Sequence, residues 1–215
     1  HNCQIGDNVF IENISNYISN YIIGECCFIQ NVDIIYVDGI STFGCNASIM
    51  VLNETGGREV PIYPRLSSSL AYIIALYRHK NGTIGKLTKL IADYSKEHES
   101  SNGTIGKQVT IINTQTIKNV KIEDCAVIEN VLRLENGTIC SNEHAPVIVK
   151  DGVIANDFIF ASGSFIAEAS KITRCFVGQA CHISHSFSAH DSLLFANCNF
   201  ENGEACAVFA GPFTV

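Results

Sequence analysis

The stretch Ile148–Ile172, IVKDGVIANDFIFASGSFIAEASKI, decides the fold. Large apolar residues recur in it every six positions, at Ile148, Ile154, Phe160, Ile166 and Ile172. A period of six fits neither the 3.6 residues of a helical turn nor the simple alternation of an amphipathic strand. It predicts short strands joined by turns, in which each strand places one large side chain inside a triangular prism.

A second motif, an aliphatic residue followed by Gly, two variable residues and a small one, marks whole coils of this prism. It occurs at Ile5–Val9 and again 18 residues later at Ile23–Cys27, as three six-residue sides require. Further copies begin at Phe43, Ile105 and Val177. We therefore predict an all-β solenoid, a parallel β-helix with about three coils in residues 3–53 and about six in 104–215. The alternative is a sandwich of short strands, whose spacing is irregular, at about 8 to 12 residues.

The segment between the two blocks has a helical texture. Pro64 is suited to open a helix, and two apolar stripes at helical spacing follow, separated by Asn81-Gly82 as a turn. The stripes are Leu66, Leu70, Ile73, Ile74 and Tyr77, and then Leu87, Leu90, Ile91 and Tyr94. The predicted organisation is one continuous domain: a first β-helix block over 1–57, an inserted α-helical hairpin or arm over 58–103, and a second block over 104–215. The arm's apolar face needs a cover, either the prism wall or another subunit of a homo-oligomer.

Composition and charge exclude some partners. The chain has 14 Lys and Arg against 21 Asp and Glu, a net charge of −7, and its basic residues do not cluster, so nucleic acid is not expected to bind. Most of the ten cysteines fall in apolar repeats and no CxxC pair occurs, which favours reduced thiols and no structural zinc. Neither a signal peptide nor a membrane span is visible, so we expect a cytoplasmic protein. Because the chain starts in a repeat and ends without a polar cap, we also expect it to be truncated at both ends.

Several runs resemble an uncharacterised bacterial family of hexapeptide-repeat proteins, common in Bacteroides-like organisms and loosely labelled acyltransferase-like. The runs are Ser41–Gly44, Asn53–Tyr63, Leu70–Tyr72, Leu76–His79 and Gly203–Pro212. The resemblance covers nearly the whole chain and implies a left-handed β-helix. It carries over no catalytic residue, since the family is a domain of unknown function.

Hexapeptide β-helices are best known as acyl- and acetyltransferases, in which a wall histidine takes the proton of an acceptor hydroxyl or amine. The candidates here are His182, His185 and His190, with His144 farther away. Asp191 is a possible orienting carboxylate, but neighbours on a strand point to opposite faces, so we do not expect it to orient His190. Outward polar residues without a catalytic role are the simpler interpretation of each histidine.

Two other sites deserve consideration. β-Helices similar to the gamma-class carbonic anhydrases hold zinc with three histidines, but the spacing of His144, His185 and His190 does not suit that arrangement, and no metal is predicted. The polar run Asn53–Pro61 could bind an anion through its Gly-Gly pair and Arg58, with Glu54 and Glu59 as further ligand-binding candidates. The alternative is that the glycines form a turn and Arg58 pairs with Glu54 or Glu59.

Two functions follow. The first is transfer of an acyl or acetyl group to a sugar or sugar nucleotide, with His182, His185 or His190 as general base and acyl-CoA or an acyl-carrier thioester as donor. The second is a non-catalytic scaffold or ligand-binding β-helix. Fold alone does not choose between them.

Overall fold

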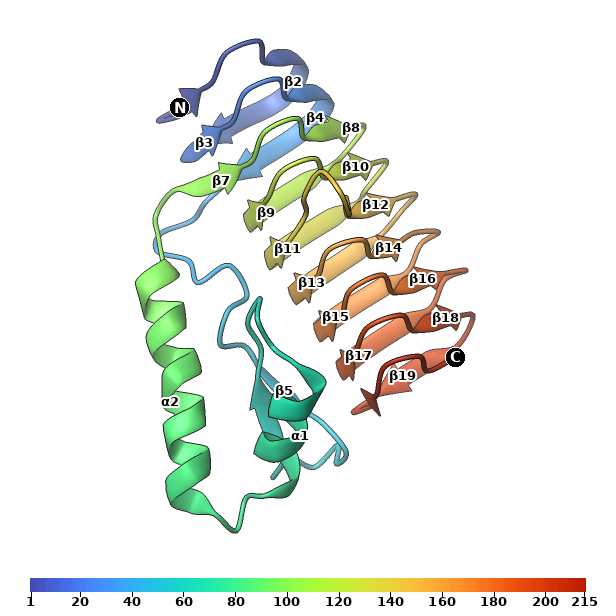
Figure 1. The fold of residues 1–215 in the computed structure, drawn as a ribbon. Coiled ribbons are helices and arrows are strands. Elements are labelled where there is room, and N and C mark those ends of the chain that lie inside the picture. The colour runs from blue at the N-terminus through green and yellow to red at the C-terminus, as the bar shows by residue number, and fades with distance from the viewer.

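A computed structural model describes all residues, 1–215. Its main stack is an 18-stranded sheet in which every pairing is parallel, wound into a parallel β-helix, with two helices and a small hairpin beside it (Figure 1). The strands of the stack are β1 (Gln4–Ile5), β2 (Phe10–Ser19), β3 (Tyr21–Ile23), β4 (Phe28–Tyr36), β7 (Gly103–Ile105), β8 (Thr110–Ile112), β9 (Thr116–Ile122), β10 (Val127–Glu129), β11 (Arg133–Ile139), β12 (Ile148–Lys150), β13 (Ile154–Phe160), β14 (Phe165–Ile166), β15 (Lys171–Val177), β16 (His182–Ser184), β17 (Ser188–Leu194), β18 (Asn199–Glu201), β19 (Glu204–Cys206) and β20 (Phe209–Ala210).

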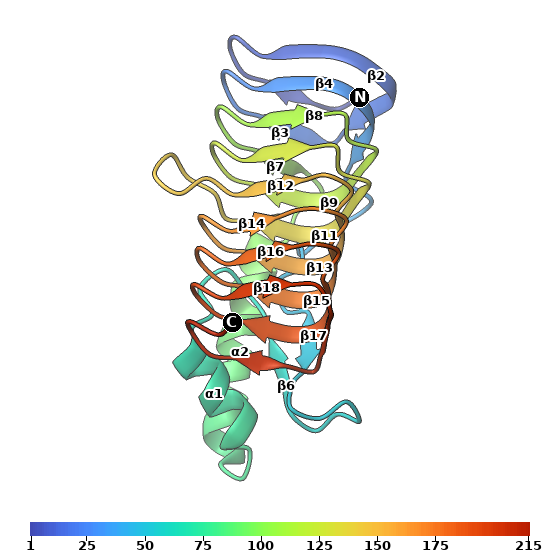
Figure 2. The same ribbon diagram turned by 90° about the vertical axis from the view of Figure 1, so that its right-hand side faces the viewer.

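Each coil has three walls. The first wall is formed by the short strands β8, β10, β12, β14, β16 and β18, which stack in one column (Figure 2). The longer strands β9, β11, β13, β15 and β17 bend at their fourth residue, where the backbone has a positive φ. Their first halves form the second wall and their second halves form the third.

Most coils in the second block repeat every 17 residues, and one that includes the loop at His144 takes 21, whereas the first coils repeat every 18. One side of the prism is thus a residue shorter than the hexapeptide pattern predicts. The positions that point inward therefore differ in part from those predicted. Phe160, Ile166 and Ile172 are buried as predicted, but Ile148 and Ile154 lie outside the core. Their neighbours Val149 and Ala155 point inward instead.

Left-handed backbone marks the corner between the first and second walls. Asparagine accepts positive φ more readily than most residues, and this corner carries a ladder of amides. The side chains of Asn13, Asn31 and Asn113 each donate to the asparagine of the next coil, at 2.9–3.1 Å, and Asn130 donates to Asp151 at 3.2 Å. The ladder satisfies the corner side chains while fixing the register of the coils.

An insertion, residues 38–102, interrupts the stack after its second coil. Tyr21 pairs with Gly103 and Phe28 with Thr110, so the coils before and after the insertion stack directly on each other. The first β-helical part therefore ends earlier than expected, at Val37, and the predicted boundary after Gly57 falls inside a hairpin turn. The repeat copy beginning at Phe43 forms no third coil, because Phe43, Gly44 and Asn46 adopt positive φ in a turn.

The insertion contains the antiparallel hairpin β5 (Ser48–Met50) and β6 (Glu59–Pro61), followed by α1 (Ser68–Leu76) and α2 (Asn81–His98). The helices lie near the predicted positions with different ends. Ser67, not Pro64, caps α1, its hydroxyl accepting from the Leu70 amide, and Asn81 begins α2 instead of joining the helices.

The insertion packs on the third wall of the last coils. A second core forms there from Ile62, Ala71 and Ile74 of the insertion and Ile159, Phe176 and Leu193 of the wall, among others. The predicted apolar stripes are only partly buried, since Ile73, Tyr77 and Leu90 are exposed. No helix is both long and apolar enough to cross a bilayer.

Candidate functional site

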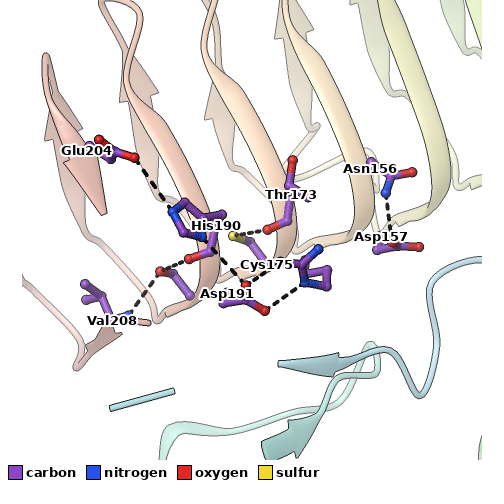
Figure 3. Close-up of polar contacts among 10 residues, drawn as sticks. Asn156, Asp157, Thr173, Cys175, His190, Asp191, Glu204 and Val208 are labelled. Carbon is purple, nitrogen blue, oxygen red and sulfur yellow. Dashed lines mark hydrogen bonds and ion pairs between the residues drawn. The ribbon is translucent and has the colours of Figure 1, made fainter. Parts of the chain in front are cut away.

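His190 ends the second-wall half of β17, on the outer face, and is partly exposed (Figure 3). It stacks between Thr173 of the preceding coil and Cys206 of the following one. Its Nδ1 lies 3.6 Å from Asp191 Oδ2 and its Nε2 lies 3.7 Å from Glu204 Oε1. One imidazole thus faces a carboxylate on each side.

Asp191 does reach its neighbour His190, contrary to the alternation argument. Asp191 lies at the corner between the second and third walls and has a φ of +49°. The chain turns there, so successive side chains no longer point to opposite faces. Burial acts to raise the pKa of Asp191, but the Arg174 guanidinium, the Met50 amide and His190 outweigh it and hold the pKa below its usual value. A carboxylate so fixed stays ionised and is able to orient the imidazole.

A column of polar residues occupies the corner between the second and third walls and ends at Asp191. Its members are Asn119, Asn136, Asp157, Arg174 and Asp191, all with positive φ. Asn119 donates to Asn136 at 3.0 Å, and Arg174 donates to Asp191 through Nε at 2.8 Å. Asp157 and Arg174 were not predicted as site residues. Asp157, Arg174 and Asp191 follow one another at intervals of 17 residues, a signal that the assumed period of 18 conceals.

The three predicted histidines do not converge. His182 lies on the first wall, with its ring stacked 4.6 Å from that of Phe165. His185 occupies the corner between the first and second walls, where its Nε2 lies 3.4 Å from Glu168 and its Nδ1 3.9 Å from Glu201. His144 lies in a loop closed by Asn142 and Ala145. Each histidine therefore has its own surroundings, and His190 alone borders the polar column.

The Gly-Gly run forms the tip of the β5–β6 hairpin. The Gly56 amide donates to the Asn53 carbonyl at 3.0 Å and the Gly57 amide to the Glu59 carboxylate at 2.6 Å, so both amides are occupied within the loop. Glu59 forms its ion pair with Arg78, at 3.1 Å, while Arg58 is exposed. This geometry leaves no free amide pair for an anion.

Glu54, in the same hairpin tip, approaches the His190 region. Desolvation and the nearby Glu54 carboxylate raise the pKa of the Cys206 thiol. Cys206 pairs in register with His190. The hairpin therefore brings Glu54 close to the second wall, one coil after His190. No group of three or more His, Cys, Asp or Glu residues is arranged to hold a metal ion.

The chain matches the family described as Domain of unknown function (DUF4954) over residues 1–215. It belongs to this family. The expected kinship with a domain of unknown function is thereby confirmed, while the family match says nothing of hexapeptide repeats or acyl transfer. An uncharacterized protein of Treponema pallidum (strain Nichols) is 25% identical over 162 residues, which cover 70% of this chain and 22% of that protein. The chain thus spans about a fifth of that relative's length. No solved structure matches.

Proposed function

We propose that the chain transfers an acyl group from acyl-CoA or an acyl-carrier thioester to a hydroxyl of a sugar or sugar nucleotide, with His190 as the general base. The observation that carries the proposal is the His190–Asp191 contact of 3.6 Å beside a carboxylate fixed by Arg174. Imidazole oriented by a buried carboxylate is a recurrent arrangement for proton abstraction near neutral pH.

In the proposed step, Nδ1–H faces Asp191 and Nε2 accepts the proton of the acceptor hydroxyl. The acceptor oxygen attacks the thioester carbonyl, the carbon–sulfur bond breaks, and the leaving thiolate takes the proton back from the imidazolium. Glu204, 69% exposed, is free to swing away from Nε2 when the acceptor arrives.

The test is the release of free thiol from acetyl-CoA with sugar and nucleotide-sugar acceptors. His190→Gln should lower turnover by about 10²–10⁴-fold, the usual contribution of a general base. His182→Gln and His185→Gln are matched controls on other faces and should retain activity. Equal turnover in all four proteins, or no acceptor-dependent thiol release by the wild type, refutes the proposal.

A non-catalytic binding role is the second candidate, favoured by the exposed apolar side of the arm. Tyr72, Ile73, Leu76 and Tyr77 of α1 and its end remain exposed, as does Leu90 of α2. If this surface joins copies of the chain into a homo-oligomer, Tyr77→Glu should lower the mass measured by light scattering, whereas Thr83→Glu in α2 should lower it less. An unchanged mass in both variants removes this role from the arm.

A further inference from the structure

The insertion and the corner between the second and third walls border an open cavity of about 390 Å³, and His190 is not among its lining residues. Asn119, Asn136 and Asp157 form one side and the loop Ser41–Ala47 forms the other. The volume falls within the range of small-molecule sites, roughly 300–1,000 Å³.

The loop is held rigidly against the corner. Thr138 donates to the Phe43 carbonyl at 2.6 Å, and Ser41 exchanges two backbone hydrogen bonds with Ser100. Gly44 fits because it lacks a side chain, since a Cβ there would lie 2.7 Å from the Asn136 carbonyl oxygen. The cavity is therefore formed before any ligand enters, which lowers the entropic cost of binding.

The corner side chains are positioned by one another and keep hydrogen-bonding capacity. Asn119 accepts from the Asp38 amide at 2.8 Å and donates one N–H to Asn136, which leaves its second N–H unused. Asp157 accepts from Asn156 at 2.8 Å, and a carboxylate has about four acceptor positions. The cavity thus offers an N–H donor at Asn119 and a carboxylate acceptor at Asp157.

The lining excludes several ligand classes. It contains no Lys, Arg or His to bind a phosphate, no aromatic ring to stack on a base, and a single carboxylate, too few for a metal ion. Arg174 lies close enough to act electrostatically on Asp157, which disfavours a cationic ligand. A neutral ligand rich in hydroxyl groups remains.

We propose that this cavity is a binding site for a neutral sugar, with Asn119, Asn136 and Asp157 bonding its hydroxyls. The site stands independently of acyl transfer, because His190 does not line it.

Saturation-transfer NMR with glucose, galactose and N-acetylglucosamine at millimolar concentration tests the site. Thr42→Trp would fill the cavity from an exposed position, and Asp157→Asn would remove the charge while keeping a residue that this corner already carries at Asn119 and Asn136. At least one sugar should receive saturation from the wild type, bind about tenfold more weakly to D157N, and lose the signal in T42W. Thr83→Trp, on exposed α2, should bind like the wild type. No transfer to any of the three sugars, or equal transfer in T42W and the wild type, overturns the proposal.

Discussion

Arg174 and Asp191, one coil apart, form a two-pronged ion pair: Nε lies 2.8 Å from Oδ1 and Nη2 lies 2.5 Å from Oδ2. The Asp191 side chain is only 6% exposed, and the Met50 amide of β5 also bonds it. The pair therefore stabilises the corner at the point where the insertion contacts it.

Arg174→Ala should lower the free energy of unfolding by about 1–2 kcal/mol, because it leaves a buried carboxylate without its main partner. The value lies below that of a fully buried pair, since Arg174 is 41% exposed and solvent screens it. Urea unfolding measures the change. Arg174→Lys, which keeps the charge but not the two-pronged geometry, should lose less.

This difference should depend on pH. The folded-state pKa of Asp191 is lowered, so its contribution is present above the unfolded value of about 3.9 and is lost as pH falls through the folded value. The wild type and R174A should differ most near neutral pH and converge as pH drops below about 4. An equal difference at both ends of the range would contradict this account of the pair.

Gly137→Ala should destabilise the coil by about 1–3 kcal/mol through overpacking. A Cβ at this buried position in β11 would lie within 2.3 Å of the Phe158 ring, which has no room to move. Gly85→Ala is the opposite case, because no atom lies within 4 Å of its Cβ and α2 continues on both sides. It should stabilise by about 0.5–1 kcal/mol in the same thermal or urea measurement.

The asparagines at the corner between the first and second walls adopt a left-handed backbone and form the amide ladder. Asn113→Ala and Asn113→Gly separate these two roles. Asn113 has φ +50°, accepts from Asn31 at 2.9 Å and donates to Asn130 at 3.1 Å. Glycine loses the two side-chain bonds but accepts the backbone, whereas alanine also carries a left-handed penalty of about 1–2 kcal/mol. N113A should therefore unfold at lower urea than N113G. The reverse order would mean that backbone conformation does not select the residue.

Ile74→Ala should cost about 2–5 kcal/mol, because the side chain is fully buried between α1 and the third wall. Ile73→Ala, one residue earlier and 39% exposed, should cost much less. Denaturant unfolding followed by far-ultraviolet circular dichroism gives both values. Equal losses would indicate that another surface covers Ile73 in solution.

The repeat allowed the β-helix and the helical insertion to be predicted, since both depend on local spacing. The inward register was only partly predictable. Ile148 and Val149 are equally apolar, and only the loss of one residue per coil decides which of them points inward. The start of the insertion is not visible in the sequence, because Phe43-Gly44 matches the repeat motif although its backbone forms a turn with positive φ instead of a strand.

The candidate site was predictable in part for a related reason. Its residue type makes His190 a candidate, but strand alternation predicts no contact with Asp191, because the alternation rule does not hold across a corner of the prism. Asp157 and Arg174 belong to a column that exists only once coils are stacked at the correct period. Such residues can be recognised as neighbours only when the number of residues in each coil is known, and local sequence spacing does not give that number.

The insertion also governs the order in which the molecule is completed during synthesis. Tyr21 packs under Gly103 and its hydroxyl donates to the Val120 carbonyl at 2.8 Å. Asn31 bonds Asn113, 82 positions later, so the second coil acquires its neighbour only after the whole insertion has been translated. At about 5–20 residues per second this interval is roughly 4 to 16 seconds. For that time the nascent coil exposes an unpaired strand edge, and a chaperone that recognises such edges would meet it there.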